Sequence, residues 1–227
     1  SEERFNWLKK VAGEVIATPG CESNVKEIFD KCNELSAERG DDIVIFNQFD
    51  QFGNYLWHYE VTGEAIEEIV KKEVPNSENF KGYLTSTGSG GTLAAGDYLR
   101  KLYPHLKLAA GEALQCPTLL NNGFGGHRIE GIGDKHVPWI HNVRNTDMVV
   151  AVDDNDAMNV MRLFNEPAGK EYLKEQGVSQ EFIDNADLLG ISGIGNVIAA
   201  IKMAKYYEYD EDDVVVTVLT DSMEMCE

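Results

Sequence analysis

A glycine-rich stretch near the middle of the chain has the residue types of an anion-binding loop. Its members are Gly88, Ser89, Gly90, Gly91 and Thr92. An apolar, hydroxyl-rich run precedes it, and a helical pattern of apolar residues follows it. Glycine lets the backbone approach a ligand closely and adopt positive φ angles. The unpaired N–H groups and the dipole of a helix N-terminus favour an anion, typically a phosphate. The sequence therefore predicts a phosphate-binding turn between a strand and a helix.

Several interpretations of this loop are open on its residues alone. A dinucleotide fingerprint would need a glycine where Leu93 stands, and the acidic candidate about 20 residues further on, Glu112, lies in no clear strand–helix–strand unit. A Walker-type loop would need a lysine before its Ser or Thr, and that lysine is absent. A cup for a smaller phosphorylated cofactor needs only backbone N–H groups and the hydroxyls of Ser89 and Thr92. A tight turn without any ligand is the remaining alternative.

The overall composition is that of an acidic globular protein. The chain has 227 residues, with 20 Lys and Arg against 39 Asp and Glu, and a formal net charge of −19. This charge argues against binding to nucleic acid and to anionic membrane surfaces. No apolar run approaches the ~20 residues of a membrane helix, and no signal peptide is visible. Because the four cysteines are also too sparse for a disulfide framework, we expect a cytoplasmic protein that binds neither nucleic acid nor membrane.

Strand and helix patterns alternate along most of the chain. Apolar runs predict strands at residues 14–17, 42–47, 82–86, 106–111, 147–153 and 214–219, with another run from Leu188 into a second glycine turn at 190–196. Helical spacing predicts helices at residues 5–15, 23–39 (capped by Ser23), 62–72 (capped by Thr62), 93–102, 154–165, 171–176, 180–185 and 197–206, with 48–59 irregular. This alternation predicts an α/β fold: an open, mostly parallel, twisted sheet with helices on both faces, in three layers. Ligands of such sheets bind outside the carboxyl ends of the strands, where both glycine turns would lie.

Five stretches occur in the order and spacing of one enzyme family. They are residues 48–63 (Q-F-D, then H-Y-E-V-T-G), 88–92 (G-S-G-G-T), 129–138 (I-E-G-I-G-D-K-H-V-P), 190–192 (G-I-S) and 214–222 (V-V-V-T-V-L-T-D-S). Together they resemble the cysteine synthase and cystathionine β-synthase family of fold-type-II pyridoxal-phosphate enzymes. The resemblance extends from about residue 5 to the C-terminus, and it implies a fold like that of the tryptophan synthase β subunit.

The resemblance assigns roles to residues of this chain. It implies that the loop at 88–92 binds the phosphate of pyridoxal 5′-phosphate and that Ser192 contacts the pyridine nitrogen. A neutral hydroxyl there leaves the nitrogen largely unprotonated, which suits β-elimination and β-replacement on serine, O-activated serine or cysteine. From the residues alone, Ser192 could also cap the helix at 197–206. The substrate-pocket candidates are Gly131, Ile132, Gly133 and Asp134. A homodimer is implied for the intact enzyme.

Two family motifs have no counterpart in this chain. They are the N-terminal segment with the cofactor-binding lysine and the S-G-N-T-G-type loop that grips the substrate carboxylate. The chain therefore resembles only the C-terminal part of such an enzyme. We interpret residues 1–46 as a remnant of the N-terminal cofactor and substrate domain, and residues 47–227 as the C-terminal α/β domain. We assign no Schiff-base lysine and expect the isolated chain to be inactive. The alternatives are a non-catalytic module that binds a phosphorylated ligand and a nicotinamide-dependent oxidoreductase.

The histidines and one charged segment allow further interpretations. His58, between Trp57 and Tyr59, could be a base, although a core position is favoured. The spacing of the other candidate histidines fits no standard zinc pattern, so no metal site is expected; these residues are His127, His136 and His141. Residues 134–136 (Asp-Lys-His) could line the mouth of the pocket and select the substrate or nucleophile, or form a solvated turn.

Overall fold

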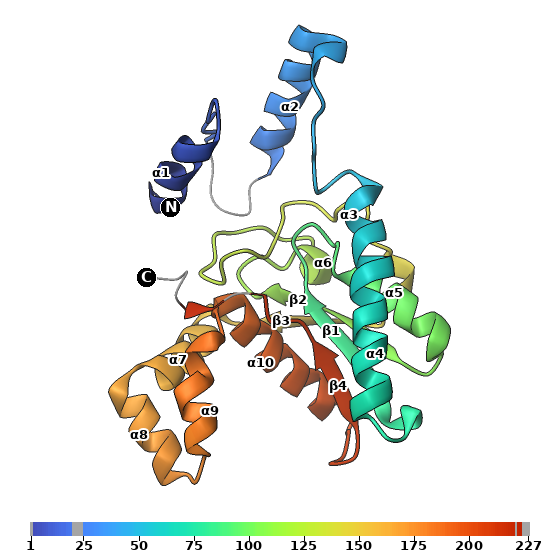
Figure 1. Cartoon of the computed structure of the whole chain (residues 1–227), viewed down its shortest axis with the longest axis vertical. Helices are drawn as coiled ribbons and strands as arrows, with labels where there is room; N and C mark the ends of the chain where they lie inside the picture. Colours follow the sequence, from blue (N-terminus) through green and yellow to red (C-terminus); the bar gives the residue numbers. More distant parts are fainter. Residues whose placement is uncertain (1, 20–24, 221, 224–227) are drawn as a thin grey trace.

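The computed structural model describes residues 2–19, 25–220 and 222–223, and its centre is a parallel β-sheet (Figure 1). The strands of the described residues are β1 (Phe80–Ser86), β2 (Lys107–Ala113), β3 (Met148–Val152) and β4 (Val214–Thr217). They stand in the order β3-β2-β1-β4, and every neighbouring pair is parallel. The predicted strands at 82–86, 106–111, 147–153 and 214–219 are thus confirmed.

The strand order changes direction at β1. From β1 the chain passes through α5 (Leu93–Leu102) to β2 and then to β3 on one side. A long crossover returns it to the other side of β1, where Phe80 pairs with Val214 in β4. The crossover contains α7 (Asp154–Asn165), α8 (Pro167–Glu175), α9 (Gln180–Asn185), η5 (Ala186–Leu188) and α10 (Ile191–Tyr206). A change of direction of this kind leaves a crevice at the carboxyl ends of the two strands, here β1 and β4.

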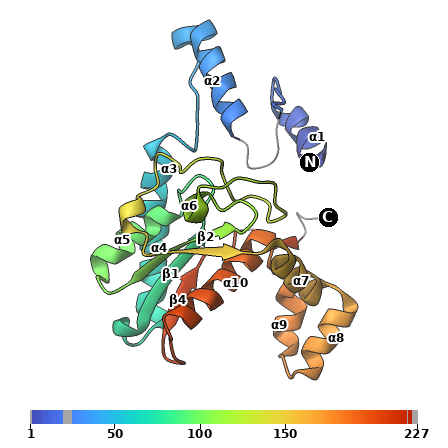
Figure 2. The same ribbon diagram turned by 180° about the vertical axis from the view of Figure 1, so that it is seen from behind.

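Helices cover both faces of the sheet (Figure 2). On one face α4 (Gly63–Glu73) and α5 pack over Tyr83 and Leu108, and on the other α7 and α10 pack over Leu84 and Ala109. Neighbouring residues of a strand point to opposite faces, so adjacent apolar residues of β1 and β2 serve two separate cores. The expected three-layer α/β/α fold is therefore confirmed.

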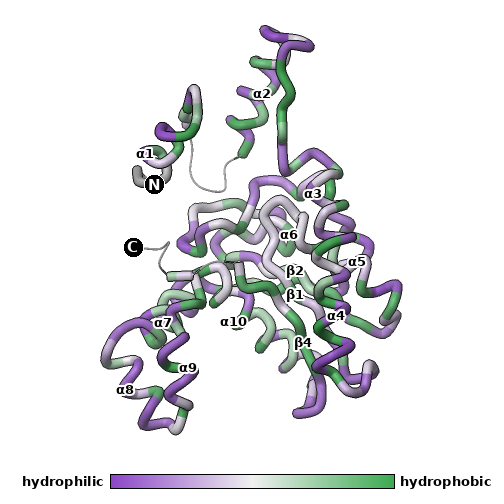
Figure 3. The backbone as a smooth tube through the Cα atoms, viewed as in Figure 1, coloured by the Kyte–Doolittle hydropathy of each residue, from purple (hydrophilic) through white to green (hydrophobic). Residues whose placement is uncertain are grey.

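The N-terminal segment lies apart from this sheet. It contains α1 (Glu2–Val11), α2 (Lys26–Arg39) and η1 (Gly40–Asp42), followed by an extended, largely apolar stretch (Figures 1 and 3). The strands predicted at 14–17 and 42–47 are wrong. A strand needs a neighbour to pair its backbone groups, and no described segment pairs with either run. Val44 and Phe46 are consequently 76% and 87% exposed. The predicted cap Ser23 lies outside the described residues.

The stretch predicted to be irregular, residues 48–59, is mostly helical. After a turn, α3 (Phe52–Trp57), the π-helical η2 (His58–Thr62) and α4 form a continuous helical run, so Thr62 lies inside a helix and is no cap. Aromatic contacts hold this run to α5: Tyr55 stacks on Tyr59, which meets Tyr98 edge-on. The clustered aromatic residues are therefore spaced for helix packing.

The second glycine turn also differs from its prediction. No strand precedes it: residues 186–188 form a 3-10 turn, and α10 begins at Ile191 with Gly190 as its N-cap. Ser192 therefore lies inside the first turn and does not cap the helix. The shorter elements are η3 (Ser77–Asn79), α6 (Thr118–Asn121) and η4 (Val143–Asn145). Within the described ranges, no helix is long and apolar enough to cross a membrane.

Candidate cofactor site

The glycine loop links the end of β1 to the start of α5, as the sequence predicts. The hydroxyl of Tyr83 donates to the carbonyl of Thr92 (2.8 Å), and the hydroxyl of Thr85 donates to that of Thr92 (3.0 Å). Gly90 adopts a positive φ of 83°. Across the described structure, the backbone N–H groups of Ser89, Gly90 and Thr92 have no hydrogen-bond partner. Free N–H groups at a helix start fit an anionic oxygen.

Two side chains hold this loop closely from outside. The Asn54 amide donates to the Ser89 hydroxyl (3.0 Å) and to the carbonyl of Gln48 (2.8 Å). A Cβ added at Gly91 would lie 2.2 Å from Oδ1 of Asn54, so a larger residue here would displace the Asn54 side chain from the loop. A Cβ at Gly90 would lie 3.2 Å from Cβ of His141. Asn54 and His141 thus form two walls around the backbone of the loop.

The predicted pocket segment meets the start of the same loop. The N–H of Gly133 donates to the carbonyl of Thr87 (2.9 Å), and a Cβ at Gly88 would lie 3.6 Å from the carbonyl oxygen of Gly133. Gly131 and Gly133 both have positive φ angles, 82° and 87°. Ile132 between them is buried in the core, so its side chain stabilises the segment.

Ser192 stands at the crevice between β1 and β4. Its hydroxyl lies 2.9 Å from that of Thr220, which follows β4. One turn later on α10, the Asn196 amide accepts from the N–H of Ser86 (2.7 Å) and donates to the carbonyl of Val218 (2.7 Å). Asn196 therefore bridges the ends of β1 and β4 and holds Ser192 over the crevice that the glycine loop borders. Thr220 lies in the stretch 214–222 and Asn196 in the second glycine turn, but the sequence alone assigns neither a role, because their hydrogen-bond partners are distant in the chain.

Comparisons with known proteins agree with this geometry. No family model matches the chain. It is 31% identical over 221 residues to a cysteine synthase of Staphylococcus aureus, covering 96% of this chain and 62% of the relative. A crystal structure of a hydrogen sulfide-producing enzyme of Fusobacterium nucleatum aligns with a TM-score of 0.77 at 28% identity, over 99% of this chain and 60% of that one. The chain is a homologue of the cysteine synthases.

The homologues also include cystathionine β-synthase. A cystathionine β-synthase of Apis mellifera is 26% identical over 230 residues. The homologues are pyridoxal-phosphate enzymes of fold type II, so the resemblance drawn from the motifs is confirmed. The chain spans less than two thirds of the length of these cysteine synthase relatives.

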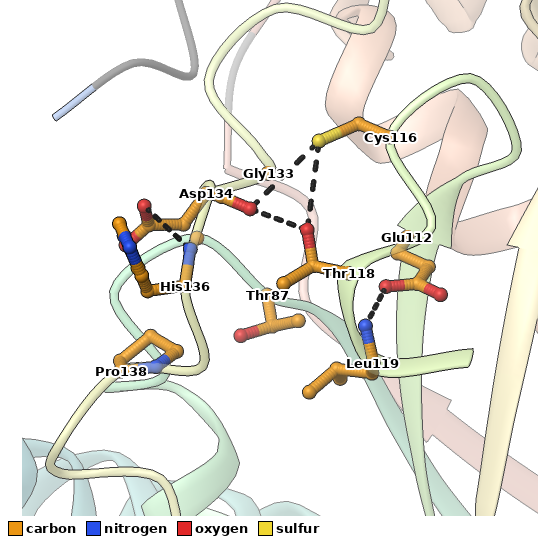
Figure 4. Close-up of a pocket in the computed structure, with 10 residues that line it drawn as sticks. Thr87, Glu112, Cys116, Thr118, Leu119, Gly133, Asp134, His136 and Pro138 are labelled. Carbon is orange, nitrogen blue, oxygen red and sulfur yellow. Dashed lines mark hydrogen bonds between the residues drawn. The ribbon is translucent and has the colours of Figure 1, made fainter. Parts of the chain in front are cut away.

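Within this cysteine synthase-like fold, a small pocket lies beside Gly88 (Figure 4). Its volume of about 10 Å³ is close to the minimum for one water molecule. Thr87 lies between Asp134 on one side and Glu112 on the other, and its hydroxyl is buried without a partner. Glu112 accepts from two backbone N–H groups of α6, but burial still raises the pKa of its carboxyl. Thr87 and Glu112 therefore join the predicted candidates.

Asp134 is the buried acid of the predicted pocket segment. Its carboxylate accepts from the N–H of His136 (3.3 Å), and its carbonyl accepts from the hydroxyl of Thr118. Burial raises the pKa of the Asp134 carboxyl. Since Asp134 is 5% exposed, the interpretation of its side chain as part of a solvated turn is wrong.

His58 and His141 contact different threonine residues. His58 Nδ1 lies 3.0 Å from the Thr62 hydroxyl, and burial lowers the pKa of its half-buried imidazole. His141 Nε2 lies 2.9 Å from the Thr146 hydroxyl, and burial lowers its pKa as well. The described residues contain no group of His, Cys, Asp and Glu that could hold a metal ion.

Proposed function

We propose that this chain forms the phosphate- and ring-binding part of a pyridoxal-phosphate enzyme. The reaction would be β-replacement or β-elimination on serine, O-activated serine or cysteine. One observation carries the proposal: the free N–H groups of Ser89, Gly90 and Thr92 border the same crevice as Ser192. The homology supports the reaction class, because a related hydrogen sulfide-producing enzyme has been crystallised with an α-aminoacrylate intermediate.

The residues present fit the cofactor at both of its ends. Gly88, Ser89, Gly90, Gly91 and Thr92 would hold the phosphate, because the N–H groups of Ser89, Gly90 and Thr92 are free to donate to an anion. Ser192, paired with the Thr220 hydroxyl, would hydrogen-bond the ring nitrogen as a neutral group. When bound, pyridoxal phosphate supplies an electron sink for the amino acid. Gly131, Gly133 and Asp134 would face the substrate beyond the phosphate loop, with Ile132 anchoring them.

The isolated chain would not catalyse this reaction. No lysine stands in the motif that the family uses to bind the cofactor, so we propose that the chain by itself is inactive. Residues 1–46 would belong to the N-terminal domain and residues 47–227 to the C-terminal one. The intact enzyme would be a cytoplasmic homodimer acting on a small amino acid.

A titration with pyridoxine 5′-phosphate tests the site without needing a lysine, since this compound has no aldehyde. We expect Gly90→Ala to weaken binding at least about tenfold, or 1.4 kcal/mol, because a side chain at positive φ strains the loop. Gly177→Ala is the matched control, since Gly177 has a φ of 82° with open space around it, in the turn after α8. Equal effects of the two variants, or no binding by the wild-type chain, would contradict the proposal.

Catalysis is tested by supplying the region that the relatives have and this chain lacks. Release of pyruvate from serine analogues, or cysteine formation from O-acetylserine and sulfide, should appear only when both polypeptides are present. Phosphate-ligand binding without recovered turnover would favour the non-catalytic module. Tight binding of a nicotinamide dinucleotide would favour the oxidoreductase instead.

A further inference from the structure

One buried carboxylate accepts hydrogen bonds from three side chains on two separate segments near the glycine loop. Asp97 lies in α5 and is 8% exposed. Its carboxylate accepts from the Tyr55 hydroxyl (2.8 Å), from the Asn142 amide (3.3 Å) and from the Asn145 amide (2.7 Å). No Lys, Arg or His in the described ranges forms an ion pair with it. All three hydrogen-bond donors to this carboxylate are neutral side chains, and hydrogen bonds to a charged acceptor are the strong kind.

Two of these donors are chain neighbours of the residues that form the walls of the loop. Tyr55 follows Asn54, whose amide donates to Ser89 and whose side chain closes over Gly91. Asn142 follows His141, whose Cβ backs Gly90. In each pair, one residue binds Asp97 and its neighbour contacts the loop. We propose that Asp97 is a positioning residue that fixes both walls of the phosphate-binding loop through the pairs Asn54–Tyr55 and His141–Asn142.

The chemistry of the side chain explains why an acid stands at this position. Three donors converge on Asp97, and a carboxylate offers two acceptor oxygens with about four lone-pair sites. Asparagine would offer a single acceptor oxygen, and its NH₂ group would face a donor. The Asp97→Asn variant keeps the shape of the side chain, but depending on how its amide is oriented it must release either Asn145, which lies in the same segment as the His141–Asn142 pair, or Tyr55 and Asn142, which share Oδ2.

The glycine loop depends on contacts from outside because its own backbone forms few hydrogen bonds. Its free N–H groups form no bonds within the protein, and glycine is the residue with the largest conformational freedom to lose. A binding site whose donors are already ordered avoids the entropic cost of ordering them when the ligand arrives. Asp97 thus acts on affinity for the phosphate while touching no ligand itself.

Nuclear magnetic resonance of the full ¹⁵N-labelled chain tests this role. Backbone order parameters of Ser89, Gly90 and Gly91 report the loop without any ligand, and a titration with pyridoxine 5′-phosphate reports its affinity. We expect Asp97→Asn to lower those order parameters and to weaken binding about tenfold. Tyr55→Phe should weaken binding about threefold, and should add little in the Asp97→Asn background, because the two residues share one bond.

The matched control is Tyr98→Phe. The Tyr98 hydroxyl donates to the Glu67 carboxylate (2.6 Å). This is also a bond between a tyrosine hydroxyl and a carboxylate that involves α5, but it connects α5 to α4 and not to the walls of the loop. Its loss should lower the melting temperature as Tyr55→Phe does, while leaving the loop order and the affinity unchanged. If Asp97→Asn fails to fold, Tyr55→Phe carries the comparison.

The inference would be overturned if Asp97→Asn and Tyr55→Phe changed only the melting temperature, as Tyr98→Phe does. The choice of pyridoxine 5′-phosphate as the ligand rests on the proposed function, whereas the ordering of the loop by Asp97 does not. If the wild-type chain bound no pyridoxine 5′-phosphate, the proposed function would fail, and the order parameters would still decide whether Asp97 positions the loop.

Discussion

Residues 1–46 and residues 47–220 carry similar apolar patterns but differ in what covers them. In the second region Phe80 and Tyr83 are completely buried between the sheet and its helices. In the first, Trp7, Val44 and Phe46 are 61%, 76% and 87% exposed. The apolar run at 42–47 is as strand-like in sequence as β1, yet it pairs with nothing in the described structure. An apolar pattern thus predicts burial only where another segment of the same fold can cover it.

The largest expected difference between the two regions lies in their apolar side chains. Leu99→Ala should lower the free energy of unfolding by about 2–5 kcal/mol, because Leu99 is completely buried between α4 and the sheet and leaves a cavity. Phe46→Ala should change it by less than about 0.5 kcal/mol. Urea unfolding of both variants measures the contrast. A comparable loss in Phe46→Ala would show that residues 43–46 are packed in solution.

A smaller effect is expected from pH, and it should belong to the second region alone. All five histidines lie between residues 58 and 141. Burial lowers the pKa of His58 and His141, so the unfolded chain takes up their protons first as the pH falls below 6.5. Stability should therefore decrease with falling pH in that window, by at most about 1.4 kcal/mol per pH unit for each proton.

Replacing the more buried histidine isolates this effect. His141→Gln should flatten the pH dependence of urea unfolding between pH 7 and pH 5 relative to the wild type. The raised pKa values of Glu112 and Asp134 act in the opposite direction, since their protonation favours the folded state. A steeper dependence in the variant would mean that His141 is protonated in the folded protein.

The smallest expected effect comes from removing residues 1–46 altogether. The described contacts across the boundary include a hydrogen bond from the Gln51 amide to the carbonyl of Ile45 and the Phe29–Phe49 ring pair, at 6.4 Å between centroids. Such ring pairs contribute about 0.5–1.5 kcal/mol. The shortened chain should therefore lose about 1 kcal/mol and keep the pH dependence of the full chain. A loss approaching that of Leu99→Ala would show that the two regions form one cooperative unit.

The sequence predicted most of what lies between β1 and β4. Strands that are buried on both faces appear in the sequence as apolar runs. The glycine loop was recognisable because a backbone that must approach a ligand closely is rich in glycine. The helical character of residues 52–62 was missed because it shows in the contacts of Tyr55 and Tyr59 with α5, which the local pattern could not reveal. Asn196 and Asp97 were missed for the same reason: their hydrogen-bond partners lie far away in the chain. Thr87 was missed because only the fold shows its buried hydroxyl beside Asp134 and Glu112.

The return of β4 to β1 has a consequence for how this protein folds. Phe80 must find Val214 across most of the chain, and non-local pairings of this kind make folding slow. The contacts of Ser192 with Thr220 and of Asn196 with Val218 can form only after β4 has docked. The glycine loop and the side chains that hold it lie between residues 54 and 145, before β4 in the chain. The phosphate end of the site should therefore be in place early during synthesis, whereas the ring end waits for the last strand to arrive.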